Sequence, residues 1–280
     1  KPTRFFDLDP TEDPNKWRLP VDMGISVGPP KHKFLFGGVG LASAIRALEL
    51  TTDRPLIWAT AQYLSFAMPG ETVEVDVRAA TEGKNVTQAR VLGHVGDREI
   101  YTVNAAVGTR GKDLDHQWVH MPDVPGPEDC ERQPRFRPKV DDEPDDLQQR
   151  MHVRVAAGRY GKKRSEGGLS EDGRAMLWCR PLDETTPIDA TMLAVIADFV
   201  PGATGNALGM QAGSNSLDNT LRIRKLVETD WVLADIQVQG IHDGFVHGEA
   251  RLFAEDGTLM AVASQSGIVR IWDGESKRFR

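Results

Sequence analysis

Alternation of apolar and polar residues marks antiparallel strands in both halves of the chain. The clearest case is TVEVDVRAA, which begins at Thr72 and is apolar at every second position through its first six residues. This alternation is typical of a strand with one buried face and one exposed face. Pro69-Gly70 and Glu82-Gly83 are turn signals between neighbouring strands. These patterns predict strands at 56–67, 71–82, 85–96 and 98–109, and again at 216–224, 231–241, 245–254 and 259–270.

Apolar residues with helical spacing precede each set of strands. In the first half they fall within 36–50, a segment whose second and third residues are both glycine. In the second half they fall within 187–200, where Met192, Ile196 and Phe199 lie on one side of a helical wheel. Pro187 opens this segment, and proline is favoured at the first position of a helix. Each half is therefore predicted to have one helix followed by four antiparallel strands.

A similar sheet ending occurs twice, at 84–108 and at 244–267. Each copy has a strand with an Ala-Arg-apolar sequence, a turn with Gly and Asp, and a returning strand of small and apolar residues. Ala89-Arg90-Val91 marks the first copy and Ala250-Arg251-Leu252 marks the second. The spacing, about 160 residues, is far too long for a solenoid repeat. It indicates a duplicated and fused domain, and the seam between two such halves is a natural place for a ligand.

A helix followed by a curled antiparallel sheet, twice in one chain, is the pattern of an α+β double hotdog fold. We expect an N-terminal hotdog at 1–112 and a C-terminal hotdog at 149–280, and each of these lengths suits one hydrophobic core. The segment between them, 113–148, is rich in Pro and acidic residues and lacks sustained periodicity. This composition favours a linker or a segment draped over the surface.

Composition and charge narrow the class of protein. The net charge of −7 argues against nucleic acid as a partner, because a phosphate-binding surface needs clustered positive charge. No run approaches the roughly 20 apolar residues of a membrane span, and the first residues lack the apolar core of a signal peptide. Two cysteines, Cys130 and Cys179, make no disulfide framework and suit a reducing compartment, so we expect a cytoplasmic protein.

The sequence predicts neither a metal site nor a cofactor. His116 and His120 are four residues apart, but they lie in a segment rich in Pro and Asp without a glutamate ligand pattern. Neither cysteine lies beside a histidine, and Cys179 next to Trp178 is typical of a core residue.

Short motifs in both halves resemble those of the bacterial acyl-CoA thioesterase II family, whose members are double hotdogs that hydrolyse acyl-CoA. The resemblance covers 34–110 and 178–270, and it is carried by the order and spacing of the motifs together. They are FGG at 36–38, the Pro69-Gly70 turn, ADFVP at 197–201, SLDNT at 216–220, WVL at 231–233, GFVHGE at 244–249, Asp256-Gly257 and SQSGIVR at 264–270.

The resemblance implies three catalytic residues. The family's aspartate falls on Asp198, its hydroxyl residue on Ser216 and its glutamine on Gln265. The chain has Ser where the family often has Thr, and both side chains can donate and accept a hydrogen bond. Hydrolysis of a thioester needs an oriented water, a group that accepts its proton and a donor for the developing oxyanion. Asp198, as the general base, and Ser216 are expected to hold and polarise the water, and the side-chain amide of Gln265 or a nearby backbone N–H is expected to stabilise the tetrahedral intermediate. Direct attack by the carboxylate stays open.

Each of these residues also has a structural interpretation. Asp198 lies away from the apolar stripe of its helix, as a solvated carboxylate would, although a partner half could pack on that side. Ser216 lies in GSNSLDNT, where such residues usually form turns and caps, and Asp218 is a competing candidate. Gln265 lies among small and apolar residues and could simply connect strands, since a buried amide needs partners.

Four further residues are candidates for substrate binding. Gly37 and Gly38 open the first helix, where backbone N–H groups favour anionic ligands, although a glycine pair also permits close packing. Arg222 and Arg224 alternate on one face of a predicted strand and could meet the phosphates of CoA. The same spacing is found on an ordinary solvated face.

Three functions remain open, and a water-using acyl-CoA thioesterase is the hypothesis that the motifs favour. An enoyl-CoA hydratase of the same fold is less favoured, because Asp198 is followed by FVPGA without a histidine. A non-catalytic acyl-CoA-binding module would keep the same residues. Because hotdog sheets commonly pair, a homodimer or higher homo-oligomer is a further expectation. The length of the acyl chain is not encoded in a linear pattern.

Overall fold

The computed structural model describes residues 4–29, 32–133, 145–161 and 165–271. Every candidate catalytic and substrate-binding residue lies in these ranges. Part of the expected linker, 134–144, lies outside them, as do 1–3 and 30–31 of the expected N-terminal unit and 162–164 and 272–280 of the C-terminal unit. The exact limits of the units stay predictions.

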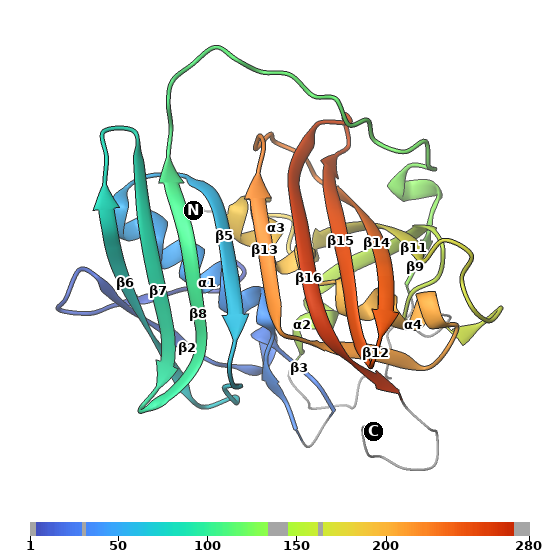
Figure 1. Cartoon of the computed structure of the whole chain (residues 1–280), viewed down its shortest axis with the longest axis horizontal. Coiled ribbons are helices and arrows are strands. Elements are labelled where there is room, and N and C mark those ends of the chain that lie inside the picture. Colours follow the sequence, from blue (N-terminus) through green and yellow to red (C-terminus); the bar gives the residue numbers. More distant parts are fainter. Residues whose placement is uncertain (1–3, 30–31, 134–144, 162–164, 272–280) are drawn as a thin grey trace.

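One antiparallel sheet of fourteen strands runs through the described part of the chain, and the helices lie on one side of it (Figure 1). The strand order is β1-β2-β6-β7-β8-β5-β13-β16-β15-β14-β11-β10-β9, with β12 also paired to β16. The strands are β1 (Asp9–Pro10), β2 (Lys16–Pro20), β5 (Leu56–Tyr63), β6 (Thr72–Glu82), β7 (Val86–Val95), β8 (Arg98–Gly108), β9 (Glu131–Arg132), β10 (Met151–Ala157), β11 (Arg174–Pro181), β12 (Ala212–Ser216), β13 (Asp218–Ile223), β14 (Val232–His242), β15 (Phe245–Ala254) and β16 (Leu259–Ile271). A separate pair joins β3 (Ser26–Val27) to β4 (Phe34–Leu35).

In the first unit, β5 to β8 curl around helix α1 (Gly37–Thr52). The helix is buried almost without interruption from Gly38 to Leu48, because it lies between the sheet of its own unit and a helix of the second unit, α3 (Ala190–Ala197). It ends at Asp53, which takes the left-handed conformation (φ 53°) that commonly closes a helix.

The second unit has two helices where the sequence predicted one at 187–200. Helix α3 (Ala190–Ala197) is capped by Asp189, whose side chain accepts hydrogen bonds from the backbone of Thr191 and Met192. Helix α4 (Val200–Leu208) follows after a break at Asp198. Pro201 explains the break, because proline has no N–H for the i−4 carbonyl of Ala197. The prediction of a single helix was therefore wrong in both length and continuity.

The two units join edge to edge through the antiparallel pairing of β5 with β13. Thr60 lies opposite Thr220, and their hydroxyl oxygens are 3.0 Å apart. Because the two residues occupy corresponding places 160 positions apart, an internal two-fold axis passes between them. The sheet is continuous across this seam, and the architecture is the predicted α+β double hotdog.

The segment after β8 covers the outer face of the second unit's sheet. The Trp178 indole N–H donates to the carbonyl of Pro125 at 2.9 Å, and the Gln117 side chain bonds the backbone of Gly257 and Leu259. Figure 1 shows this segment, in green, passing above the upper ends of β13, β16 and β15 before it descends on the second unit. Its described part is thus draped on the protein. Strands β10 and β11 extend the same unit and were not predicted, although β11 is apolar almost throughout.

By length and composition alone, the stretch Ala190–Leu208 could cross a membrane. Of its most apolar 18 residues, 83% are buried inside the protein. The buried core helix of a globular protein can have the same length and composition, and here the stretch is divided into α3 and α4. Its apolar side chains belong to the interior of the fold.

Candidate active site

The side chains of Asp198, Ser216 and Gln265 meet in one hydrogen-bonded group, which we call the acid–amide trio. The Ser216 hydroxyl donates to Oδ1 of Asp198 at 3.2 Å, and the Gln265 Nε2 donates to the same oxygen. A second hydrogen of Nε2 is donated to the Ser216 Oγ at 2.7 Å. Two residues, from β12 and β16, therefore converge on the carboxylate at the end of α3.

The fold explains how each member of the trio is held. Asp198 ends α3 just where Pro201 stops the helix from continuing, and only 3% of the residue is exposed. Gln265 is 5% exposed and comes from a buried position of β16, on the face toward the helices. Ser216 is the last residue of β12 and is only half-buried. The hydroxyl is thus the member of the trio that lies nearest to solvent.

The first unit contributes to the same site through the start of α1. The backbone N–H of Gly38 donates to Oδ2 of Asp198 at 2.6 Å. A Cβ atom at Gly37 would lie 2.9 Å from this oxygen, and one at Gly38 would lie 2.8 Å from the Cβ of Asp198. The glycine pair therefore permits α1 to approach the carboxylate. A role of Gly37 and Gly38 in binding substrate stays a prediction.

Burial raises the pKa of Asp198 to about 6, against the opposing effect of hydrogen bonds from Gln265, Gly38 and Ser216. A carboxylate with this pKa is mostly ionised near pH 7, yet it is more basic than an ordinary aspartate. Both properties suit a general base, which works best when its pKa is close to the operating pH.

The raised pKa has a consequence for stability. The folded protein holds the Asp198 proton more tightly than the unfolded chain, so stabilisation present below pH 4 is lost as the pH rises through about 6. We expect the free energy of unfolding of the wild type, minus that of Asp198→Asn, to fall by roughly 2–3 kcal/mol between pH 4 and pH 7. Urea unfolding followed by tryptophan fluorescence at several pH values measures this difference. A difference independent of pH would contradict the raised pKa.

The other candidates lie apart from the trio or have structural partners. Arg222 is six residues beyond Ser216, about 20 Å along the strand direction, and is exposed. The Arg224 guanidinium pairs with Asp115, so its contact is with the draped segment. Asp218 accepts the backbone N–H of Ser266 at 2.7 Å, a bond that holds β13 to β16. Binding of CoA phosphates by Arg222 and Arg224 stays a prediction.

Two side chains that the sequence analysis did not select border the same site. The Tyr63 hydroxyl donates to the carbonyl of Gly37 at 2.8 Å, and burial followed by the Asp198 charge raises its pKa. The Asn219 side chain also interacts with this phenol and is fully buried. An amide at a core position of a strand is the only sequence signal that marks Asn219.

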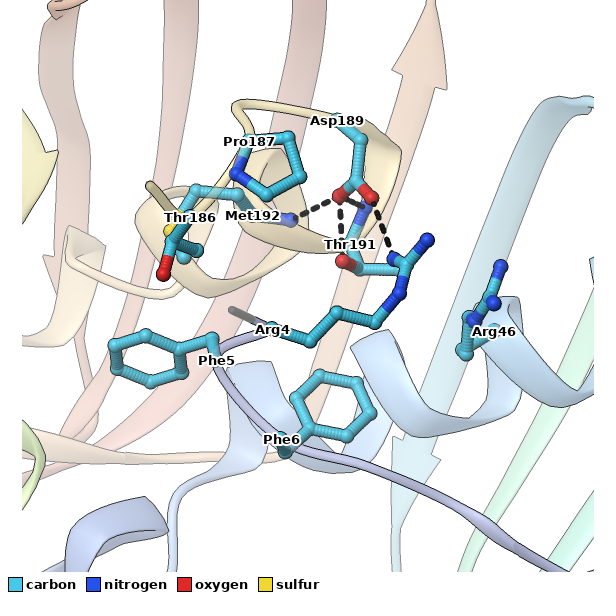
Figure 2. Close-up of a pocket in the computed structure, with 9 residues that line it drawn as sticks. All are labelled: Arg4, Phe5, Phe6, Arg46, Thr186, Pro187, Asp189, Thr191 and Met192. Atoms are coloured by element: carbon cyan, nitrogen blue, oxygen red, sulfur yellow. Dashed lines mark hydrogen bonds and ion pairs between the residues drawn. The ribbon is translucent and has the colours of Figure 1, made fainter. Parts of the chain in front are cut away.

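A separate small cavity lies at the other end of α3 (Figure 2). The guanidinium of Arg4 reaches across it to Asp189, at 3.2 Å, and Phe5 and Phe6 line one side. Its volume of about 10 Å³ is near the smallest that holds a water molecule. It contains no member of the trio and is too small for an acyl chain. Among the described residues, no three His, Cys, Asp or Glu side chains are grouped in a way that suits a metal ion.

Comparison with known proteins places both units in one family. The model of the acyl-CoA thioesterase N-terminal domain matches residues 28–110, and that of the acyl-CoA thioesterase C-terminal domain matches residues 127–269. A search of curated proteins found no match.

Solved structures agree with the family models. A candidate thioesterase from Novosphingobium aromaticivorans DSM 12444 is 31% identical, with 92% of this chain and 96% of that chain covered and a TM-score of 0.80. A candidate thioesterase II from Thermobifida fusca YX is 17% identical, with 95% and 98% covered and a TM-score of 0.82. An acyl-CoA thioesterase II from Mycobacterium marinum is 19% identical, with 96% and 98% covered and a TM-score of 0.71. The last two show the fold alone. The chain therefore belongs to the acyl-CoA thioesterase family and is a thioester hydrolase built as a double hotdog.

Proposed function

We propose that this protein hydrolyses acyl-CoA thioesters with a water molecule that Asp198 activates. The observation that carries the proposal is the buried Asp198 carboxylate, whose raised pKa and contacts with Ser216 and Gln265 suit proton transfer. The chain belongs to a thioesterase family, and this supports transfer of the acyl group to water as the reaction.

The chemistry is a single addition and elimination at the thioester carbonyl. Asp198 accepts a proton from water while the water oxygen forms a bond to the carbonyl carbon. The tetrahedral oxyanion then collapses, the C–S bond breaks, and CoA leaves with its electron pair and takes up the proton that Asp198 removed from water, which regenerates the carboxylate. The products are a free carboxylic acid and CoA, and neither an oxidant nor a covalent enzyme intermediate is needed.

The hydrogen bonds favour Asp198 as a base over Asp198 as a nucleophile. Oδ1 accepts from Ser216 and Gln265, and Oδ2 accepts from Gly38, so three donors fix the carboxylate in place. An attacking carboxylate would have to give up part of this arrangement as it bonds to the acyl carbon. A base needs only one remaining lone pair directed at the water.

Gln265 orients the site in this proposal. Both hydrogens of Nε2 are donated within the trio, and its Oε1 is buried with no protein partner among the described residues. The oxygen is therefore a ready acceptor for a hydrogen of the attacking water. Such a bond would align the water between Gln265 and Asp198.

Replacement of Ser216 or Gln265, the two neutral members of the trio, is expected to lower kcat less than replacement of the base, Asp198. Ser216→Ala and Gln265→Ala should each lower kcat by roughly 10- to 10²-fold, because the carboxylate and the water lose alignment while the base itself remains. Release of free thiol from acyl-CoA, followed with a thiol-reactive dye, gives kcat and KM. Equal kcat in the wild type and both variants would place the reaction elsewhere.

The function itself is tested with a panel of short-, medium- and long-chain acyl-CoAs. Thiol release that is linear in enzyme and saturable in substrate supports the proposal. Binding of acyl-CoA without release of thiol from any member of the panel would overturn it in favour of a binding module.

A further inference from the structure

Asn219 is a buried amide whose polar atoms lack hydrogen-bond partners. None of its surface is exposed, and neither Nδ2 nor Oδ1 forms a hydrogen bond within the described part of the chain. Its contact with the Tyr63 phenol partly offsets the rise that burial causes in the pKa of that group, but it does not meet hydrogen-bond geometry. Buried polar groups are nearly always paired, so an unpaired amide calls for an explanation.

A bulge brings this amide beside the acid–amide trio. Ser216 lies opposite Gly267 and Thr220 lies opposite Ser264, so three residues, 217–219, face the two residues 265–266. This extra residue is a β-bulge, a feature that often re-aims a side chain next to an active site. It places Ser216 and Asn219, three positions apart, beside Gln265.

The first unit provides an internal comparison for each of these positions. The axis between Thr60 and Thr220 relates Leu56 to Ser216 and Ala59 to Asn219. Thr60 pairs with Asn104 just as Thr220 pairs with Ser264, so Ala105 corresponds to Gln265.

The first unit even repeats the bulge, between Leu56 and Trp58. The counterparts of Ser216, Asn219 and Gln265 in the first unit are therefore all apolar. Ala59, the counterpart of Asn219, is fully buried, as Asn219 is. The strand does not need an amide to form. The amide occurs only in the unit that holds the trio.

The reaction needs a hydrogen-bond donor that the trio does not supply. Nε2 of Gln265 donates to Asp198 and Ser216, and the N–H of Gly38 donates to Asp198. Stabilisation of a tetrahedral oxyanion requires a donor directed at the former carbonyl oxygen. Asn219 Nδ2 is a buried side-chain donor in this region that has no hydrogen-bond acceptor.

We propose that Asn219 is a further catalytic residue, whose Nδ2 donates a hydrogen bond to the thioester carbonyl oxygen and stabilises the oxyanion formed on it. This inference rests on the proposed thioesterase function. The carbonyl π bond opens toward the oxygen as water adds, and it re-forms as the thiolate leaves, so Asn219 keeps its protons throughout. The same carbonyl oxygen gives Nδ2 of Asn219 an acceptor only when substrate is bound.

The test compares Asn219→Ala with the wild type in the thiol-release assay and in thermal unfolding. We expect kcat to fall on the order of 10²- to 10³-fold with little change in KM, because the bond strengthens in the transition state. The unfolding temperature should stay the same or rise, because an unpaired buried amide is removed. The acid limb of the pH profile should keep its midpoint, because Asp198 is untouched. Asn219→Val, which fills more of the space, should behave alike, and Thr220→Val serves as a neighbouring control with unchanged kcat.

Other outcomes overturn the proposal. Wild-type kcat in Asn219→Ala would exclude a catalytic role, and a loss of kcat together with a lower unfolding temperature would assign a structural one. A shifted acid limb would mean that Asn219 acts through Asp198. Asp198→Asn is measured in parallel, to distinguish failure of the Asn219 role from failure of the proposed function. Full turnover by Asp198→Asn would show that the reaction does not use Asp198 as its base.

Discussion

Replacing Asp198 with asparagine is expected to lower kcat for acyl-CoA hydrolysis by about 10³-fold. General-base catalysis contributes typically 10²- to 10⁴-fold, and an amide cannot accept the proton that water gives up. The wild type should lose activity tenfold per pH unit below about pH 6, as its carboxylate becomes protonated. The residual activity of Asp198→Asn should not show this loss below about pH 6. Thiol release measured from pH 4.5 to pH 8 gives both results.

Asp218→Asn is the matched control for that experiment. It makes the same change of chemistry 20 positions along the chain, at a carboxylate whose observed role is to accept the backbone N–H of Ser266. An amide oxygen can accept the same bond, so we expect kcat to stay within a factor of about three. A large loss in Asp218→Asn with little loss in Asp198→Asn would move the base to Asp218.

Replacing Gly38 with alanine is expected to damage both stability and catalysis. The new Cβ would lie 2.8 Å from the Cβ of Asp198, 2.9 Å from the Phe36 ring and 3.0 Å from the carbonyl oxygen of Ala194. Two of these atoms belong to α3 or its end, so the helices must separate. We expect a loss of about 1–3 kcal/mol in the free energy of unfolding, although alanine favours a helix by roughly 0.5–1 kcal/mol. A shift of Asp198 by about 1 Å should lower kcat by around 10²-fold.

Gly240→Ala is the control for the cost of adding a methyl group. A Cβ there would meet no atom within 4 Å, and the glycine does not take the left-handed conformation. We expect stability within about 0.5 kcal/mol of the wild type and unchanged kcat. If Gly38→Ala unfolds at the same urea concentration as Gly240→Ala, the close approach of α1 to α3 is not a constraint.

The strands and turns could be predicted from the sequence because their signal is local. Val73, Val75 and Val77 alternate with polar residues, and the buried face of β6 follows them. The break between α3 and α4 was missed, because a continuous apolar stripe outweighed the effect of Pro201. Strands β10 and β11 were missed for a related reason, since they flank a polar, Gly-rich segment that favours a loop.

The internal duplication was predicted, but its register is not the one suggested by the Ala-Arg motifs. Ala89 pairs with Ala105, and the counterpart of Ala105 is Gln265, which pairs with Gly248. Ala89 therefore corresponds to Gly248 rather than to Ala250. Register depends on pairing between distant strands, and a local motif carries little information on it.

Contacts within the site depend on distant parts of the chain, and this limits what the residues alone can predict. A helical wheel places Asp198 away from the core stripe of α3, which suggests exposure. In the structure the first turn of α1, 160 residues away, covers that side. Ser and Asn are residue types that commonly form turns and caps, so Ser216 and Asn219 do not stand out in the sequence. The bulge that re-aims both side chains depends on their pairing with β16. The resemblance to a family identified the trio, whereas Asn219 required the fold.

The seam between β5 and β13 permits an asymmetry that a dimer of identical subunits cannot have. Two copies of one hotdog would carry the same residue at position 59 and at its symmetry mate, so a buried amide would occur twice. In the fused chain, Ala59 and Asn219 differ. One half is then free to optimise packing while the other retains groups that are unfavourable for folding. Covalent linkage also makes the pairing of the halves independent of protein concentration, so dilution should not separate the donor at Gly38 from Asp198.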